Sequence, residues 1–229
     1  MKIIAKTEHI ADMMKWYDRN HSNFEKLRKK TEGLLEELID DDGIRIHAIT
    51  SRVKDKDSLV QKFLSKEGRE ITDIIGIRII VNKIEDVKEV CRLIEREFDI
   101  DELNSSDKSS ELETNEMGYL SVHYVAQMNK SRTDMTENLK YKGIKFEVQV
   151  RTILQHAWAT ISHENIYKSI GSVSSTLERK FYRVASLLET ADQALQDILD
   201  ELFQEEQAIL GRQREKRKKE KLEEILKMH

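Results

Sequence analysis

The stretch Lys145-Phe-Glu-Val-Gln-Val-Arg-Thr-Ile-Leu-Gln-His-Ala-Trp-Ala-Thr-Ile-Ser-His163 changes its hydrophobic period once, and the rest of the chain can be interpreted around that change. From Ile144 to Val150 apolar and polar residues alternate, which indicates a strand with one buried face. Further on, the apolar residues follow helical spacing, so we expect a helix with Thr152 as its N-cap. The stretch therefore predicts a strand that runs directly into a helix.

The two faces of this predicted strand differ in chemistry. The apolar face is expected to point into a core and consists of Ile144, Phe146, Val148 and Val150. The polar face consists of Lys145, Glu147, Gln149 and Arg151. A carboxylate, an amide and a guanidinium in a row suit a metal ion and a polyphosphate. The alternative, which the pattern leaves open, is the solvated face of an antiparallel strand.

Composition limits the class of protein. The chain has 229 residues, enough for one domain with a core and helical extensions. Its net charge is -4, so a site for a polyanion must be local. Cys91 is the single cysteine, which excludes an intrachain disulfide and a cysteine metal cluster. Neither a membrane-length apolar run nor a signal-peptide pattern is found, so we expect a cytoplasmic protein without a membrane partner.

The pattern divides the chain into three parts. Residues 1–43 are predicted to form an N-terminal region of one or two helices, which ends in a polar turn. Residues 44–170 mix strand and helix patterns, and we expect one α/β domain there. Residues 171–229 are predicted to be a C-terminal helical extension that ends in a basic tail from Arg212 to Lys221.

A second strand is predicted between Thr72 and Val81, where the β-branched run is almost continuous. Asp73 opens the run and Arg78 interrupts it. An unpaired buried ion is unfavourable, so each of these charges needs a partner or a ligand. A structural ion pair between the two residues and a binding site are the alternatives. Gly76 predicts a bulge or the close approach of another backbone.

Basic residues follow a third predicted strand. The segment 44–53 alternates, and its continuation puts Arg52 and Lys54 on one face. A short basic helix is predicted over 56–66 and contains Lys62. These three side chains are candidates for contact with phosphate.

A fourth strand is predicted over 118–125, after an amphipathic helix over 84–98 and a polar segment over 99–117 that we expect to be a mobile loop. Tyr119 and His123 share one face of this strand with a serine between them. A histidine in such a place is usually a structural group, so the pattern alone does not define a site.

Four motifs occur in order along the chain. They are Ser-Arg-Val-Lys at 51–54, Asp-Ile-Ile-Gly-Ile-Arg at 73–78, Gly-Tyr-Leu-Ser-Val-His at 118–123 and Glu-Val-Gln-Val-Arg-Thr at 147–152. Together they resemble the RelA/SpoT-type (p)ppGpp synthetases, and among these the small single-domain alarmone synthetases. The resemblance implies an α/β fold with a mixed five-stranded sheet, flanked by N-terminal helices and long C-terminal helices.

The resemblance also implies an activity. It is the transfer of the β,γ-pyrophosphate of ATP to the 3′-hydroxyl of GDP or GTP, which makes (p)ppGpp in stringent-response signalling. Asp73 and Glu147 would hold Mg²⁺, and Glu147 would also accept the proton of the 3′-hydroxyl. A carboxylate is a weak base for a hydroxyl, so metal assistance and positioning must supply most of the rate.

The remaining site residues divide, by the same resemblance, between the two substrates. The ATP side consists of Arg52, Lys54, Lys62 and Arg78. The GDP or GTP side consists of Tyr119, which would stack on guanine, and of His123, Gln149 and Arg151.

Two other functions stay open. Toxic family members pyrophosphorylate the 3′-end of tRNA or make adenosine alarmones, and the basic tail would fit RNA contact, although a solvated helix end is the favoured interpretation. A catalytically inactive RNA-binding or scaffold protein is the second alternative, which the two carboxylates argue against. The apolar stripe that begins at Ser175 and the resemblance together predict a homo-oligomer, with a tetramer favoured.

Overall fold

A computed structural model of the chain describes residues 2–65, 71–107, 121–165 and 174–227. The helices are α1 (Lys2–Asp41), α2 (Lys56–Ser65), α3 (Ile84–Glu97), α5 (Lys130–Thr133), α6 (Ile153–Asn165) and α7 (Ser175–Lys227), with the 3-10 helix η1 (Leu139–Tyr141). The strands are β1 (Ile46–Val53), β2 (Ile75–Val81), β3 (Phe98–Ile100), β4 (Ser106–Asp107), β5 (Val122–Met128) and β6 (Phe146–Thr152). Among the helices in these ranges, none is long and apolar enough to cross a membrane.

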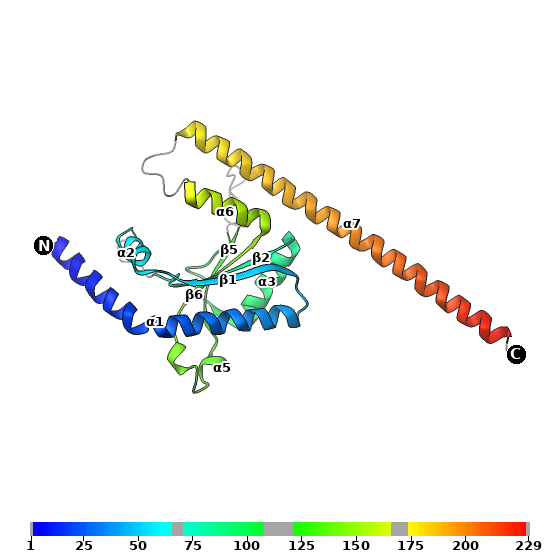
Figure 1. Ribbon diagram of the computed structural model, residues 1–229, viewed down its shortest axis with the longest axis horizontal. Helices are drawn as coiled ribbons and strands as arrows, with labels where there is room; N and C mark the ends of the chain where they lie inside the picture. Colours follow the sequence, from blue (N-terminus) through cyan, green and yellow to red (C-terminus); the bar gives the residue numbers. More distant parts are fainter. Residues whose placement is uncertain (1, 66–70, 108–120, 166–173, 228–229) are drawn as a thin grey trace.

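A mixed sheet forms the centre of the molecule (Figure 1). Five strands follow in the order β1-β2-β6-β5-β3, and the two-residue strand β4 pairs with β5. β2 and β6 are parallel, whereas the other paired strands are antiparallel. The predicted five-stranded mixed sheet is thus confirmed, and β4 is an addition to it.

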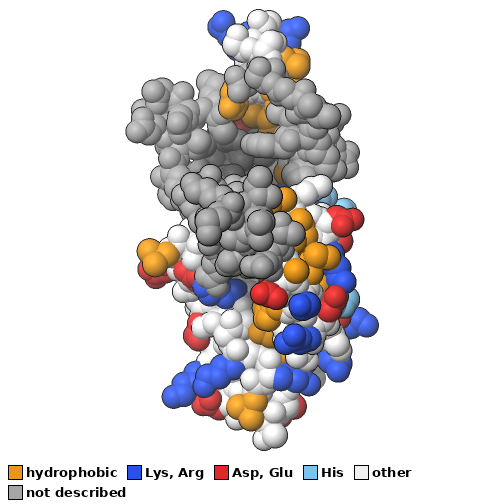
Figure 2. Space-filling model, turned by 90° about the vertical axis from the view of Figure 1, so that its left-hand side faces the viewer, with side chains coloured by type: hydrophobic (Ala, Val, Ile, Leu, Met, Phe, Trp, Pro, Cys, Tyr) orange, Lys and Arg blue, Asp and Glu red, His pale blue; other side chains and the backbone are white. Residues whose placement is uncertain are grey.

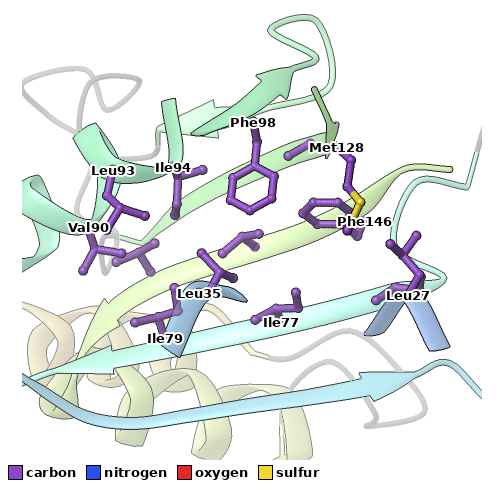
Figure 3. Close-up of a cluster of buried hydrophobic side chains, with 14 of the residues drawn as sticks. Leu27, Leu35, Ile77, Ile79, Val90, Leu93, Ile94, Phe98, Met128 and Phe146 are labelled. Carbon is purple, nitrogen blue, oxygen red and sulfur yellow. The ribbon is translucent and has the colours of Figure 1, made fainter. Parts of the chain in front are cut away.

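One face of the sheet is covered by α1 and α3 (Figure 1). Buried side chains of α1 recur at helical spacing and include Tyr17, Phe24, Leu27, Leu35 and Ile39. Alternate residues of the two parallel strands meet this layer, among them Ile77, Ile79, Phe146, Val148 and Val150. In Figure 3 side chains of α3 lie close to Phe98, whose ring meets that of Phe146 edge-on at a centroid distance of 5.5 Å. The core therefore lies between the sheet and these two helices.

Thr152 joins β6 to the helix that covers the opposite face. Its hydroxyl accepts a hydrogen bond from the Gln155 backbone N–H at 3.1 Å, and the Gln155 side chain accepts one from the Thr152 N–H at 2.8 Å. This reciprocal pair is a capping box, which fixes the direction in which α6 leaves the sheet. Thr152 as the N-cap is therefore confirmed.

The long helix α7 is fastened to the domain by buried polar contacts. The Thr152 hydroxyl donates to Asp192 Oδ2 at 2.6 Å, and both side chains are buried. Gln196 accepts a hydrogen bond from the Glu85 backbone N–H at 3.1 Å and so caps the start of α3. Beyond this point α7 extends away from the sheet (Figure 1), and its described side chains are mostly exposed.

Two predictions about local structure are wrong. The segment over 99–117, expected to be a mobile loop, includes the end of β3 and all of β4, and residues 108–117 lie outside the described part. Between these strands Asp101 accepts bonds from the N–H groups of Asn104 and Ser105, so the polar residues close a turn there.

Gly76 also differs from expectation. It pairs regularly with Arg52 and Glu147, and the irregularity between β1 and β2 lies at Ile46/Ala48 instead. No atom lies within 4 Å of where a Cβ would stand on Gly76. The glycine therefore marks open space above the sheet, not a bulge or a close backbone.

The contact between Thr152 and Asp192 gives a stability prediction. Asp192→Ala should lower the free energy of unfolding by about 1–3 kcal/mol, because it leaves a buried hydroxyl without its acceptor. Thermal unfolding should show a melting temperature several degrees lower. Asp197→Ala, at an exposed position of the same helix, is the matched control. Equal shifts in the two variants would contradict the buried bond.

Candidate active site

The sheet face opposite α1 carries the predicted site residues in rows set by strand register. One row of paired residues is Arg52, Gly76, Glu147 and Val125. The next row is Thr50, Arg78, Gln149 and His123. Neighbouring strands are about 4.8 Å apart, so side chains within and between these rows can touch. Residues from four strands thus form one surface.

A hollow of about 200 Å³ opens over these rows. Five of the predicted site residues line it: Arg52, Asp73, Arg78, Glu147 and Gln149. Gly76 contributes part of the floor, between the arginine of β1 and the glutamate of β6. The missing side chain of Gly76 keeps this part of the floor open.

Asp73 is held by two lysines. Lys54 Nζ lies 2.6 Å and Lys62 Nζ lies 2.5 Å from the same oxygen, Oδ2. Burial raises the pKa of the Asp73 carboxyl, but the hydrogen bonds and charges of the two lysines outweigh burial, and the net pKa lies below its usual value. The other oxygen, Oδ1, is buried and has no hydrogen-bond partner. A buried ionised oxygen without a partner is costly and is typical of a position that takes a ligand.

Glu147 is held in a similar way. His123 Nδ1 lies 3.2 Å from Glu147 Oε1, and the Gln149 amide donates to the same oxygen at 2.6 Å. Burial raises the pKa of this carboxyl, but His123 and Gln149 lower it further than burial raises it. Glu147 is therefore ionised at neutral pH, and the negative charge of Asp73 lies close enough to act on its pKa.

Arginine side chains crowd the same face. Arg151 is 5% exposed, donates to Gln149 through Nη2, and forms no ion pair with a described carboxylate. Its Nε is buried without a partner. Burial, with the charge of Arg78, lowers the pKa of Arg151 to about 10. Burial and the charge of Arg52 likewise lower the pKa of Arg78. Such an accumulation of positive charge suits a bound polyanion.

His156 of α6 borders this cluster of arginines. Its Nδ1 is buried and has no hydrogen-bond partner. Burial, then Arg78, Arg151 and His47, lower the pKa of His156, so its ring is neutral at pH 7. His163, seven residues further along the same helix, has a side chain outside the described part.

The structure brings nine of the ten predicted site residues together at this hollow. Lys54 and Lys62 join it through Asp73, while His123 joins through Glu147 and Arg151 through Gln149. Tyr119 lies outside the described residues. The alternative prediction, a structural ion pair between Asp73 and Arg78, is wrong. The described partners of Asp73 are Lys54 and Lys62.

Sequence reasoning missed three contributors. Thr50 lines the hollow and Gly76 opens its floor. Ser121 Oγ lies 2.8 Å from His123 Nε2. The strand pattern had put Ser121 and His123 on one face, so their spacing of two residues was the available signal.

Asp73 and Glu147 are the described residues that could hold a divalent cation. Both are ionised, each has one oxygen with two donors, and Asp73 Oδ1 lacks any donor. No group of three or more potential metal-binding side chains occurs in the described ranges. A cation here would need further oxygen ligands from substrate or water. That arrangement suits Mg²⁺, which keeps waters and binds through one or two carboxylates together with phosphates.

Comparisons with known proteins agree with this geometry. Residues 51–172, more than half of the chain, match a family described as a region found in RelA / SpoT proteins. GTP pyrophosphokinase YjbM of Bacillus subtilis (strain 168) is 29% identical over 197 residues, which cover 83% of this chain and 89% of that protein. GTP pyrophosphokinase YwaC of the same strain is 30% identical over 161 residues, which cover 66% of this chain and 73% of that protein.

Solved structures show the same fold. Small alarmone synthetase 2 from Bacillus subtilis has a TM-score of 0.68 at 24% identity, covering 81% of this chain and 98% of that chain. Small alarmone synthetase 1 from Bacillus subtilis, bound to its product pppGpp, has a TM-score of 0.62 at 24% identity. The match covers 83% of this chain and 97% of that chain. The matched region contains all four motifs. The chain belongs to the RelA/SpoT family.

Proposed function

We propose that this protein is a GTP pyrophosphokinase, a cytoplasmic (p)ppGpp synthetase that uses ATP as donor and GDP or GTP as acceptor. Family membership and the two relatives named GTP pyrophosphokinase support this activity. The observation that carries it is the pair of ionised carboxylates, Asp73 and Glu147, at one hollow surrounded by basic side chains. A polyphosphate with its Mg²⁺ is the ligand that such a mixture of charges fits.

The donor side is formed by Arg52, Lys54, Lys62 and Arg78. ATP carries several negative charges, which these side chains would neutralise. In the free protein both lysines are bonded to Asp73 Oδ2. We expect the phosphates of ATP to compete for these ammonium groups, so that Asp73 becomes available as a ligand when the nucleotide is bound.

The reaction forms one bond and breaks one. The 3′-oxygen of the acceptor attacks the β-phosphorus of ATP, the bond from that phosphorus to the oxygen bridging it to the α-phosphate breaks, and AMP leaves. The proton of the 3′-hydroxyl passes to Glu147. Asp73 and Glu147 would hold Mg²⁺, which when bound supplies charge neutralisation at the polyphosphate. Because Glu147 has a lowered pKa, it is a weak base, and correct positioning of the hydroxyl must contribute much of the rate.

The acceptor side is formed by residues next to Glu147. His123 and Gln149 both bond the catalytic carboxylate, and Arg151 is buried against Gln149. We expect them to orient the ribose and phosphates of GDP or GTP. Tyr119 as the platform for guanine stays a prediction.

Replacing either carboxylate should abolish synthesis. We expect Asp73→Asn and Glu147→Gln each to reduce the turnover of ATP with GDP by at least about 100-fold, since both changes keep the volume and remove the charge. The double variant should be no worse than the single ones, because residues that act as a unit are not additive. Asp134→Asn, at an exposed position, is the control. Activity within a few-fold of wild type in either single variant would contradict the assignment.

The acceptor can be identified directly. The protein is incubated with γ-labelled ATP and either GDP, GTP, AMP or deacylated tRNA, and the labelled products are separated. We expect GDP or GTP to be labelled far better than tRNA, and deletion of all residues after Gly211 to leave this activity largely intact. On the face seen in Figure 2, basic and acidic side chains are interspersed.

The opposite result would favour the tRNA alternative. A tRNA-modifying enzyme should lose affinity steeply with salt, with a log–log slope of several units. Preferred labelling of tRNA that disappears on deletion of the tail, or preferred labelling of AMP, would contradict the proposed acceptor.

We also propose that the protein is a homo-oligomer, with a tetramer favoured. The part of α7 beyond its contact with α3 exposes many large apolar side chains: Ile198, Leu199, Leu202, Phe203, Ile209 and Leu210. Contiguous apolar surface of this kind is typical of an interface.

Light scattering tests the assembly. The chain mass is 26.9 kDa, and we expect a multiple of it at micromolar concentration. The double substitution Leu202→Glu and Phe203→Glu should lower the measured mass, because buried charge opposes association. Gln207→Glu on the same exposed helix adds charge without removing apolar surface and serves as the control. A monomeric mass for the wild type would contradict the proposal.

A further inference from the structure

A continuous line of polar contacts runs from Ser121 through His123 to Glu147. Ser121 Oγ lies 2.8 Å from His123 Nε2, and His123 Nδ1 lies 3.2 Å from Glu147 Oε1. Ser121 directly precedes β5 and His123 is its second residue, so both side chains lie on the sheet face that carries Glu147. The His123 side chain therefore lies between the serine hydroxyl and the carboxylate.

The chemistry of the carboxylate determines the hydrogen positions in this line. Glu147 is ionised, so its oxygens only accept hydrogen bonds. His123 Nδ1 must therefore carry the hydrogen that faces Oε1. In the neutral ring Nε2 is then an acceptor, and the Ser121 hydroxyl donates to it. The serine thus favours the one neutral tautomer that can bond the carboxylate.

Gln149 holds the same oxygen from the other side. Arg151 Nη2 donates to Gln149 Oε1, and Arg78 Nε lies 3.5 Å from that oxygen. An amide whose oxygen faces two guanidinium groups must turn its nitrogen the other way, and the nitrogen donates to Glu147 Oε1 at 2.6 Å. Both supports act on Oε1. Oε2 has no hydrogen bond from a described side chain, and it remains for the ligand.

We propose that Ser121 is a positioning residue for the pyrophosphoryl transfer, acting through His123 to fix the orientation of Glu147. The inference rests on the proposed role of Glu147. Without the hydroxyl, the His123 ring loses the bond that fixes both its tautomer and its rotation. The carboxylate then keeps only the support from Gln149, and Oε2 is held less firmly toward the acceptor hydroxyl.

Steady-state kinetics of the full-length chain test this role. Ser121→Ala should lower kcat with ATP and GDP by roughly tenfold, the lower end of the effect of removing a hydrogen-bond partner behind an active-site ligand. The KM values for ATP and GDP should change by less than about twofold, since the serine contacts neither substrate in this account. Ser121→Thr keeps the hydroxyl and should restore most of the kcat. Ser131→Ala, which removes an exposed serine hydroxyl that bonds Asn129, is the matched control.

Nitrogen-15 NMR of histidine-labelled protein gives a second readout without substrate. The spectra are recorded at a pH at which the His123 ring is neutral, and the His123 signal is assigned by its absence in His123→Asn. This signal should show a protonated Nδ1 and an unprotonated Nε2 in wild type and a mixture of tautomers in Ser121→Ala. The inference is overturned if Ser121→Ala keeps both the wild-type kcat and the tautomer. It is also overturned if the threonine variant restores nothing, or if the alanine variant changes only the KM for GDP. A wild-type protein that makes no (p)ppGpp would instead refute the proposed function, and the NMR result would still test the bond.

Discussion

The parallel pairing of β2 with β6 is the constraint on which the site depends. These two strands are far apart in sequence, and their register places Gly76 beside Glu147 and Arg78 beside Gln149. Because side chains alternate, the same register sends Ile77 and Val148 into the core on the other face. A slip of one residue would bury the charges and expose the apolar side chains, so the packing of the core against α1 and α3 fixes the geometry of the site.

The charged groups on this face are only partly paired with one another, so a ligand would supply the missing partners. Two lysines share one oxygen of Asp73, and two donors share one oxygen of Glu147. Arg151 nearby is buried and forms no ion pair with a described carboxylate, and burial lowers its pKa to about 10. Unpaired buried charge lowers the stability of the free protein. Binding of the proposed polyphosphate and cation would recover this free energy. It could then serve to position the acceptor, a contribution to the rate that a weak base cannot make.

Much of this fold and site could be predicted from the sequence, and the exceptions have physical causes. Strict alternation before Thr152 and helical spacing after it are local signals, and they were sufficient to predict the strand and the helix. The structure adds the capping pair of Thr152 with Gln155. The choice of ion-pair partner is not local. The lysines that hold Asp73 come from the end of a strand and from α2, so the sequence alone left a pair of Asp73 with Arg78 open as an alternative. The role of Gly76 could not be predicted, because the open space above it depends on which side chains the neighbouring strands place beside it. The short strand β4 was missed because two polar residues carry no periodic pattern.

The most direct test of the central claim is the position of the cation. Crystals grown with Mn²⁺ in place of Mg²⁺ and a non-hydrolysable ATP analogue would locate the metal by its anomalous scattering. We predict one peak at about 2.0–2.3 Å, close to the distance of a Mg²⁺–oxygen bond, from an oxygen of Asp73 and an oxygen of Glu147, with Lys54 and Lys62 moved onto the phosphates. A metal bound to phosphates alone, with Asp73 still paired to both lysines, would contradict the account.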